Sequence, residues 1–284
     1  MNDVVSLILI GSGIAIIGVL AWWLLIASEG VYLGRRVVIW LYDLYAHRYD
    51  GVKHYLREYE TLYLAEPIMD AIAPQRDPLV LDVATGTGRL PLALARLDEF
   101  EGHTIGLDLS RRMLHFATES IYPYNERATF IWCAAETLPF SDDTFDVVTC
   151  LEALEFMTSP EVVVRELVRV LRPGGLILVS QRINTKLMPG KTWTSGEMQT
   201  ILKNSGLAEA KAQIWQVDYR KVWGRKGGDS AQTGVRPLIS ILRCPTCGAI
   251  QSRIDDNQWS CNACGSTAVI GKDGVVELHM IKSR

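Results

Sequence analysis

The most constraining feature of the chain is an apolar run that ends in a carboxylate and a glycine-rich turn, VLDVATGTG at positions 80–88. Glycine lets the backbone turn tightly and approach a ligand closely. A second carboxylate, Asp108, lies twenty residues beyond Gly88, at the end of another apolar run. A carboxylate at this place in a nucleotide-binding sheet accepts hydrogen bonds from ribose hydroxyls. The pattern predicts a nucleotide-type site at the carboxyl edge of a parallel sheet.

Short apolar segments alternate with amphipathic ones from Leu79 onward, which is typical of parallel strands with helices on both faces. The expected strands are 79–83, 104–107, 129–133, 145–151, 176–180, 208–217 and 219–225. The expected helices are 89–96, 111–120 with Ser110 as N-cap, 160–171 with Ser159 as N-cap, and 194–204. The last two strands are expected to form an antiparallel pair. The sequence therefore predicts an α/β fold with a Rossmann-like sheet of seven strands and flanking helices.

The N-terminal segment is apolar and carries no charge from Val4 to Ala27. As a helix it is long enough to cross the hydrocarbon core of a bilayer. A cleaved signal peptide would have a basic start and a shorter apolar stretch, whereas this start carries Asp3 and no Lys or Arg. We therefore expect a transmembrane anchor, and Arg35 and Arg36 just beyond it place the rest of a single-pass membrane protein in the cytoplasm.

Four of the six cysteines lie near the C-terminus in two Cys-x-x-Cys pairs, each followed by glycine. The expected metal ligands are Cys244, Cys247, Cys261 and Cys264. This spacing is typical of tetrahedral zinc coordination and resembles a zinc ribbon; a rubredoxin-like iron site is the alternative. Since four thiolates leave no open position, the zinc is expected to be structural. The other two cysteines, Cys133 and Cys150, lie in apolar runs and are expected to be buried free thiols.

Four sequence blocks follow one another in a characteristic order. They are LDVATGTG at 81–88, GLDLS at 106–110, AETLPF at 135–140 with FDVV at 145–148, and REL at 165–167 with LRPGG at 171–175. Through these blocks the segment 79–182 resembles the class I S-adenosylmethionine-dependent methyltransferases. The resemblance is strongest to the small-molecule branch that includes quinone-biosynthesis C-methyltransferases. It implies S-adenosylmethionine as cofactor.

The resemblance also implies roles for individual residues. Asp82 and the turn Ala84–Gly88 hold the methionine portion, Asp108 binds the ribose, and Leu109 packs on the adenine. The full cofactor-binding set is Asp82, Ala84, Thr85, Gly86, Gly88, Asp108, Leu109, Ala135 and Glu136. The family often has an acid just before the alanine of the third block, and this chain has Ala134 there. A side-chain contact to the adenine amino group is therefore missing, which affects affinity rather than fold.

Other nucleotide-site classes fit the chain less well. A nicotinamide dehydrogenase needs a third glycine in the turn, but Arg89, Leu90 and Pro91 follow Gly88. A P-loop is excluded because no Gly-Lys-Ser/Thr follows. A Rossmann turn that binds no methyl donor remains the structural alternative.

Methyl transfer needs a general base only when the acceptor must lose a proton. The weak candidates are Glu152, Glu155, His47 and His54. Each also has an ordinary interpretation, since an acid near the cofactor or a lone histidine is often structural.

Five regions are expected along the chain. They are an anchor at 1–28, a helical juxtamembrane or lid segment at 29–73, a methyltransferase domain at 74–226, a linker at 227–238 and a zinc ribbon at 239–284. Helical packing is the favoured interpretation of the tyrosine-rich segment 29–73, and a lid over a lipophilic substrate is the functional alternative.

Together these patterns predict a membrane-anchored, cytoplasm-facing methyltransferase that uses S-adenosylmethionine on a hydrophobic small molecule such as a quinone or lipid. A net charge of -3 weighs against a nucleic-acid partner. Two alternatives stay open: a methyltransferase acting on protein or RNA, and a non-catalytic scaffold that binds S-adenosylmethionine.

Overall fold

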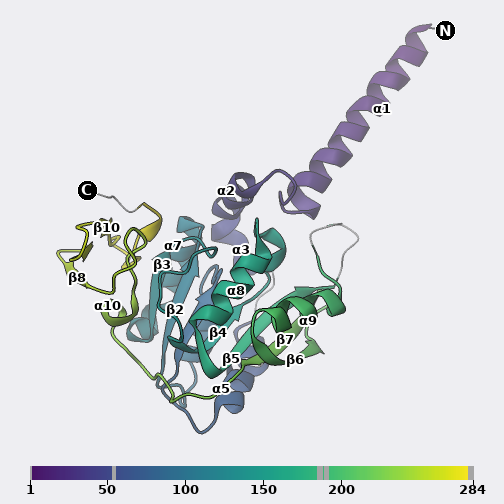
Figure 1. Ribbon diagram of the computed structural model, residues 1–284. Helices are drawn as coiled ribbons and strands as arrows, with labels where there is room; N and C mark the ends of the chain where they lie inside the picture. The colour runs from purple at the N-terminus through teal and green to yellow at the C-terminus, as the bar shows by residue number, and fades with distance from the viewer. Residues whose placement is uncertain (1, 53–55, 184–187, 189–191, 281–284) are drawn as a thin grey trace.

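The computed structural model of the protein describes residues 2–52, 56–183, 188 and 192–280. A seven-stranded sheet forms its centre, an apolar helix projects from the N-terminal side, and a small module lies beside one sheet edge (Figure 1). The predicted α/β fold with a Rossmann-like sheet of seven strands is confirmed.

The strand order of the sheet is β3-β2-β1-β4-β5-β7-β6. The strands are β1 Leu79–Val83, β2 His103–Asp108, β3 Ala128–Trp132, β4 Phe145–Cys150, β5 Leu171–Arg182, β6 Leu207–Ile214 and β7 Tyr219–Lys226. The first five run parallel, and β7 pairs antiparallel with both β5 and β6. The order reverses between β1 and β4, so the carboxyl ends of β1 and β2 lie next to a topological switch point, where α/β sheets bind ligands.

Successive residues of the strands face opposite sides, and each side has its own helical layer. The helices of this region are α5 Glu66–Ile72, α6 Arg89–Ala95, α7 Arg111–Ile121, α8 Pro160–Val170 and α9 Ser195–Asn204. Val80 of β1 packs with α5 and α6, whereas its neighbours Leu79 and Leu81 pack in the same cluster as α8 and α9. All five residues of β1 are buried, because both faces are covered.

The helices that begin after Ser110 and Thr194 have side-chain caps. The Ser110 hydroxyl, predicted as an N-cap, accepts a hydrogen bond from the Met113 amide at 3.1 Å, and Thr194, which was not predicted as a cap, forms a reciprocal capping box with Glu197. Ser159 occupies the predicted N-cap position of α8 but makes no side-chain hydrogen bond there, and Pro160 follows it in the first turn.

Two strand boundaries differ from prediction by three residues or more. The strand expected at 176–180 begins earlier, as β5, because Leu171 already pairs with Phe145 before a register shift. The strand expected at 208–217 ends at Ile214, since the amides of Trp215 and Gln216 bond the Tyr219 carbonyl in a tight turn.

The N-terminal helix α1 spans Asn2–Trp22 and continues into a π-helical turn, η1, at Trp23–Ala27. The apolar stretch Asp3–Ala27 is long enough to cross a membrane, and none of its most apolar window is buried against the rest of the protein. Its length, composition and position fit both a membrane span and a signal sequence. After a short connection come α2 Arg35–Tyr45, η2 Ala46–Arg48, α3 Tyr49–Val52, α4 Arg57–Glu60 and η3 Thr61–Ala65.

The segment expected as a linker, 227–238, runs along the amino edge of the sheet, opposite the glycine-rich turn. Asp146 at the start of β4 is fully buried and accepts hydrogen bonds from the amides of Thr233 and Gly234, at 2.8 and 3.0 Å. Arg172 pairs with the same carboxylate at 2.7 Å. The segment is therefore bound along part of its length.

The remaining described residues, 238–280, form what we call the C-terminal module. It contains α10 Leu238–Ile241, η6 Leu278–Met280 and a three-stranded antiparallel sheet of β8 Ser252–Asp255, β9 Gln258–Cys261 and β10 Thr267–Val269. Val276 pairs with the edge strand β3: its carbonyl accepts from the Trp132 amide at 2.9 Å and its amide donates to the Phe130 carbonyl at 3.0 Å. The module therefore extends the central sheet.

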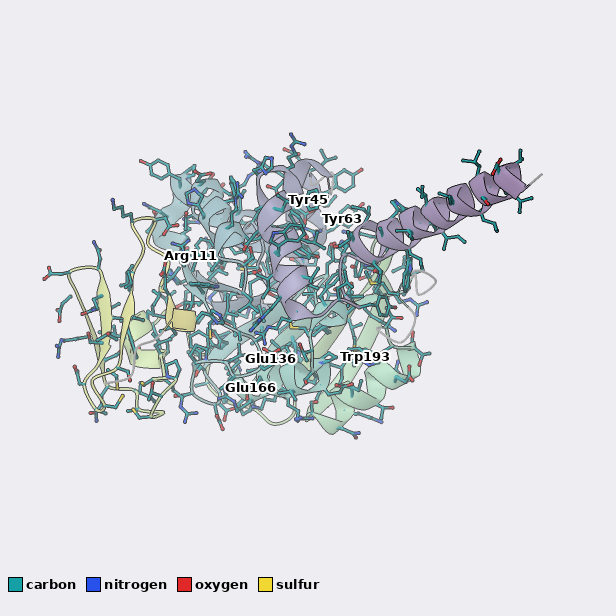
Figure 2. All side chains as sticks on the ribbon, turned by 90° about the horizontal axis from the view of Figure 1, so that it is seen from above. Tyr45, Tyr63, Arg111, Glu136, Glu166 and Trp193 are labelled. Atoms are coloured by element: carbon teal, nitrogen blue, oxygen red, sulfur yellow. The ribbon has the colours of Figure 1, made fainter. Side chains whose placement is uncertain are left out.

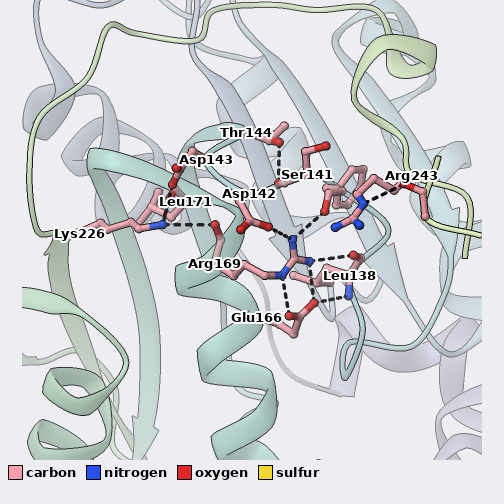
Figure 3. A network of polar contacts seen from close by, with 12 residues as sticks. Leu138, Ser141, Asp142, Asp143, Thr144, Glu166, Arg169, Leu171, Lys226 and Arg243 are labelled. Carbon is pink, nitrogen blue, oxygen red and sulfur yellow. Dashed lines mark hydrogen bonds and ion pairs between the residues drawn. The ribbon is translucent and has the colours of Figure 1, made fainter. Parts of the chain in front are cut away.

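A second contact joins the module to the loop 138–143. Arg169 of α8 fixes this loop by donating to the carbonyls of Leu138 and Phe140 while its guanidinium pairs with Glu166 and Asp142 (Figure 3). The Arg243 amide of the module then donates to the Pro139 carbonyl at 2.9 Å. The module is thus attached through backbone hydrogen bonds at two places.

Candidate active site

The glycine-rich turn after β1 has the left-handed backbone that its sequence predicts. Gly86 and Gly88 have φ angles of +56° and +79°, and Ala84 has a φ of +58°. A residue with a Cβ in this region is strained by about 1–2 kcal/mol. Ala84, which carries a Cβ, is therefore a strained position in this turn.

Asp82 at the end of β1 is buried beneath this turn. One carboxylate oxygen accepts a hydrogen bond from the Thr85 hydroxyl and the other from the Thr149 hydroxyl, both at 2.6 Å. Burial raises the pKa of Asp82 to about 6, in spite of these two bonds. The carboxylate therefore ties the turn to β4, on the other side of β1.

Asp108 ends the neighbouring strand β2 and contacts the turn from that side. Its carboxylate accepts from the Gly86 amide and from the Ser110 amide, each at 2.8 Å. Burial raises the pKa of this carboxyl group as well. The two carboxylates predicted from the sequence thus lie at one edge of the sheet and share a turn.

A cavity, which we call the cofactor cavity, opens at this edge. The predicted cofactor-binding residues that line it are Ala84, Asp108, Leu109, Ala135 and Glu136. A smaller adjoining cavity is lined by Asp82, Ala84 and Thr85. An added Cβ on Gly86 would be in van der Waals contact with a ring carbon of Tyr49 at 4.0 Å, so this ring lies over the turn. Gly88 has a packing role, since an added Cβ would lie 3.1 Å from the Cβ of Ala117.

The segment between the apolar helix and the sheet covers the cofactor cavity. Arg35 of α2 pairs with Glu136 at 3.2 Å. Asp43 accepts from the Ser110 hydroxyl at 2.5 Å. Asp50 accepts from the Thr87 hydroxyl, also at 2.5 Å. Side chains of α2 line the cavity, among them Val38, Ile39 and Tyr42. Helices α2 and α3 therefore pack over this cavity.

A model of the methyltransferase domain family matches residues 81–179, which include both carboxylates and the glycine-rich turn. This part of the chain is therefore a methyltransferase domain.

The relatives of this methyltransferase domain include quinone-pathway enzymes. A ubiquinone/menaquinone biosynthesis C-methyltransferase from Hahella chejuensis is 37% identical over 102 residues, 35% of this chain and 41% of that protein. A demethylmenaquinone methyltransferase from Clavibacter sepedonicus is 36% identical over 111 residues, 39% of this chain and 44% of the relative. The chain spans less than half the length of these relatives.

Solved structures share the fold of the methyltransferase domain at low sequence identity. An S-adenosyl-L-methionine-dependent methyltransferase structure from Methanococcus maripaludis has a TM-score of 0.54 at 18% identity, covering 66% of this chain and 94% of that one. A chain from the Haloferax volcanii complex of the Trm112 methyltransferase activator with a methyltransferase has a TM-score of 0.53 at 21% identity, covering 66% and 97%.

The four base candidates lie in different surroundings. Glu152 lines the cofactor cavity; its carboxylate pairs with Arg89 at 2.6 Å and accepts from Gln216 at 3.3 Å. Glu155 is buried away from that lining, and burial raises its pKa, while the Tyr219 hydroxyl donates to it at 2.5 Å. His47 is exposed on η2, and His54 lies outside the described residues.

Sequence reasoning missed several residues that shape the methyltransferase site. Tyr49 borders both cavities, Phe156 lines the cofactor cavity, and Arg89 holds Glu152 and Glu60 together. Arg89 could have been identified as a site residue from its position in the sequence, since it follows the glycine-rich turn directly. The tyrosine-rich composition of 29–73 pointed to the correct segment but not to a particular ring.

The four cysteine sulfurs of the C-terminal module all lie within 4.8 Å of one another. The Cys244 and Cys264 sulfurs are 3.6 Å apart, and those of Cys247 and Cys261 are 3.7 Å apart. Four thiolates at about 2.3 Å from a tetrahedral zinc are separated by about 3.8 Å. The cluster therefore has the spacing and the donor set for such an ion.

Proposed function

We propose that the protein transfers a methyl group from S-adenosylmethionine to a hydrophobic small molecule, a quinone or lipid, at the cytoplasmic surface of a membrane. The observation that carries this proposal is the position of α2. This helix follows the exposed apolar segment α1–η1 after a connection of a few residues, and its side chains form a wall of the cofactor cavity. An acceptor dissolved in the bilayer would thus meet the site close to the membrane surface.

The cofactor cavity fits the proposed donor. The adenosine end would lie against Asp108, Leu109, Ala135 and Glu136, with the carboxylate facing the ribose. The methionine end would lie over the turn, against Ala84, Thr85, Gly86 and Gly88, which Asp82 holds in place. When bound, S-adenosylmethionine supplies a methyl group attached to a good leaving group, so the chain's residues mainly align the acceptor and exclude water.

The acceptor side of the cavity is apolar, with Val38, Ile39, Phe156 and Met157 in its lining. The names of the quinone-pathway relatives agree with such an acceptor. If the methylated atom carries a proton, we assign its removal to Glu152, since among the described candidates it alone lines this cavity. Arg89 orients the carboxylate through their ion pair at 2.6 Å. The expected result for Glu152→Gln is a lower kcat with an unchanged dissociation constant for the donor.

We propose further that α1 and η1 are a membrane anchor and that Arg35 and Arg36 keep the following domain in the cytoplasm. We assign the four cysteines to a structural zinc ion, because all of its coordination positions would be filled by protein sulfur.

The test uses the full chain in vesicles with tritium in the methyl group of S-adenosylmethionine. Transfer is measured side by side into a lipid extract, a protein lysate and total RNA. Label is expected in the lipid extract, and Asp108→Asn should reduce it at a fixed donor concentration. Label in protein or RNA instead would establish the alternative acceptors. Donor binding without transfer into any of the three fractions would indicate a scaffold.

A further inference from the structure

A second cavity, which we call the anchor cavity, lies between the base of the apolar helix and α2. It has a volume of about 300 Å³, within the range of small-molecule sites. Its apolar and aromatic lining residues are Leu25, Ile26, Leu41, Tyr42, Tyr45 and Tyr49. Tyr45 lies close to the base of the N-terminal helix (Figure 2). Part of the lining therefore comes from the last turn of the proposed membrane span.

The anchor cavity and the cofactor cavity share a wall. Tyr42 and Tyr49 line both, and their ring centroids are 5.8 Å apart. Tyr49 also reaches over the glycine-rich turn, with its ring edge 4.0 Å from the position of an added Gly86 Cβ. The rings of Tyr42 and Tyr49 therefore lie between the anchor cavity and the cofactor cavity.

One polar group orders this boundary. The Tyr42 hydroxyl donates to a Glu29 carboxylate oxygen at 2.8 Å, and Glu29 itself lines the anchor cavity. Tyr42 also packs edge-on against Phe156 of η5, Leu154–Phe156, with centroids 5.8 Å apart. These contacts hold the Tyr42 ring from both ends, so this ring has a defined position in the wall that the two cavities share.

The surface around the anchor cavity is apolar and exposed. Large apolar side chains that are at least two-fifths exposed here are Trp22, Ile26, Leu33, Trp40, Leu44 and Tyr45. They lie at the end of the apolar segment, in the connection after it and on α2. Exposed apolar side chains beside a membrane-spanning helix are expected to lie in the interface region of the bilayer, where hydrocarbon chains are the available ligands.

We propose that the anchor cavity binds the hydrocarbon tail of the methyl acceptor, whose head group reaches the cofactor cavity past Tyr42 and Tyr49. This inference rests on the proposed function, because it assumes that the acceptor is a bilayer lipid or prenylated quinol. It adds a tail-binding site to the chain and makes the tail a determinant of specificity.

The matched variants are Ile26→Trp, which fills the cavity, and Ile17→Trp, which makes the same change on α1 outside it. Both side chains are exposed, 51% and 67%, so neither substitution overpacks the core. With the full chain in vesicles, Ile26→Trp should raise the KM for a prenylated naphthoquinol about tenfold. It should leave kcat/KM for tail-free 1,4-naphthalenediol unchanged, and Ile17→Trp should change neither value.

A second measurement does not depend on turnover. A phosphatidylcholine with a diazirine in its acyl chain is photolysed in vesicles that hold the protein, and labelled peptides are identified by mass spectrometry. Label is expected on residues 41–49 as well as on the span, and Ile26→Trp should remove it from 41–49 alone. Label confined to the span would overturn the tail site. Label on 41–49 without methylation of either quinol would leave the tail site standing and contradict the proposed acceptor.

Discussion

The two ends of the chain carry comparably clear sequence signals, yet they relate to the catalytic domain in opposite ways. None of the most apolar window of the N-terminal helix is buried, and the helix projects from the domain. In the C-terminal module, Trp259, Cys261 and Val276 belong to the same buried cluster as Leu81 and Val148 of the central sheet. A motif thus identifies a segment but does not say whether the rest of the fold depends on it.

Charged contacts reinforce the attachment of the C-terminal module. Arg111 at the start of α7 donates to both oxygens of Asp273, at 2.9 and 2.8 Å, and pairs with Glu277 at 2.8 Å. It lies between the sheet and the module (Figure 2). The ring of His279 packs on Trp132, whose indole N–H donates to the Leu109 carbonyl at 2.8 Å. The module therefore contacts Trp132, and the hydrogen bond of Trp132 positions Leu109 in the wall of the cofactor cavity.

Metal removal is expected to have the largest effect and to test this comparison directly. Because the module shares its core with the sheet, loss of zinc should lower the stability of the whole catalytic domain by several kcal/mol and weaken donor binding. Thermal denaturation and calorimetry of donor binding during chelator titration measure both, with zinc re-addition as the control. An unchanged domain transition in the metal-free protein would mean that the module is as separable as the N-terminal helix.

A smaller loss is expected for Arg111→Gln, which leaves Asp273 and Glu277 without their main cation. Breaking charge-assisted hydrogen bonds at this partly exposed site should cost about 2–3 kcal/mol. Chemical denaturation measures the change. Arg112→Gln, at the exposed neighbouring position on α7, is the matched control and should stay within about 0.5 kcal/mol of the parent protein. Equal losses in the two variants would remove the assigned role of the Arg111 pairs.

The sequence was sufficient for the sheet and for much of the candidate site, for physical reasons. Parallel strands that are buried on both faces have continuous apolar sequences, so β1 and β4 could be predicted. The turn after β1 could be predicted because it requires small residues with a left-handed backbone. The pairing of Val276 with β3 was not predictable, because two valines carry no register information and the partner lies over a hundred residues away. The Arg89–Glu152 pair was hidden in the same way, since only the folded chain brings those side chains together.

Asp82 belongs to the catalytic domain itself, and its substitution is expected to change the stability of the domain in a way that depends on pH. The folded pKa of Asp82, about 6, lies above its unfolded value, so the native state binds more protons than the unfolded state between about pH 4 and 6. The destabilising effect of the buried charge is therefore present above pH 6 and lost as the pH falls. Asp82→Asn should stabilise the protein by about 1–2 kcal/mol at pH 8 and by much less at pH 4.5. Denaturation at the two pH values decides this, and a gain that does not depend on pH would contradict it.

The smallest effect is expected at the other end of the chain. Deleting residues 1–22 removes α1 but keeps η1 and the anchor cavity, and it should change the stability of the catalytic domain by less than about 0.5 kcal/mol. Donor affinity should also stay the same, whereas turnover of a vesicle-bound acceptor should fall. Calorimetry and methyl transfer on the shortened chain measure these values. A large loss of stability would show that α1, although exposed, supports the fold.

The two edge strands of the central sheet are protected from pairing with another chain by different means. The two kinds of protection become available at different times during synthesis. β6 forms one edge and carries the charged residues Glu209 and Lys211, which discourage pairing with another chain from the moment the strand is made. β3 forms the other edge, and its cover at Val276 is synthesised only after all seven strands have left the ribosome. Until Val276 has been made and the proposed zinc ion has been bound, a nascent chain exposes β3 to its neighbours. The supply of zinc during translation would then set how many copies reach the native state and how many are lost to aggregation.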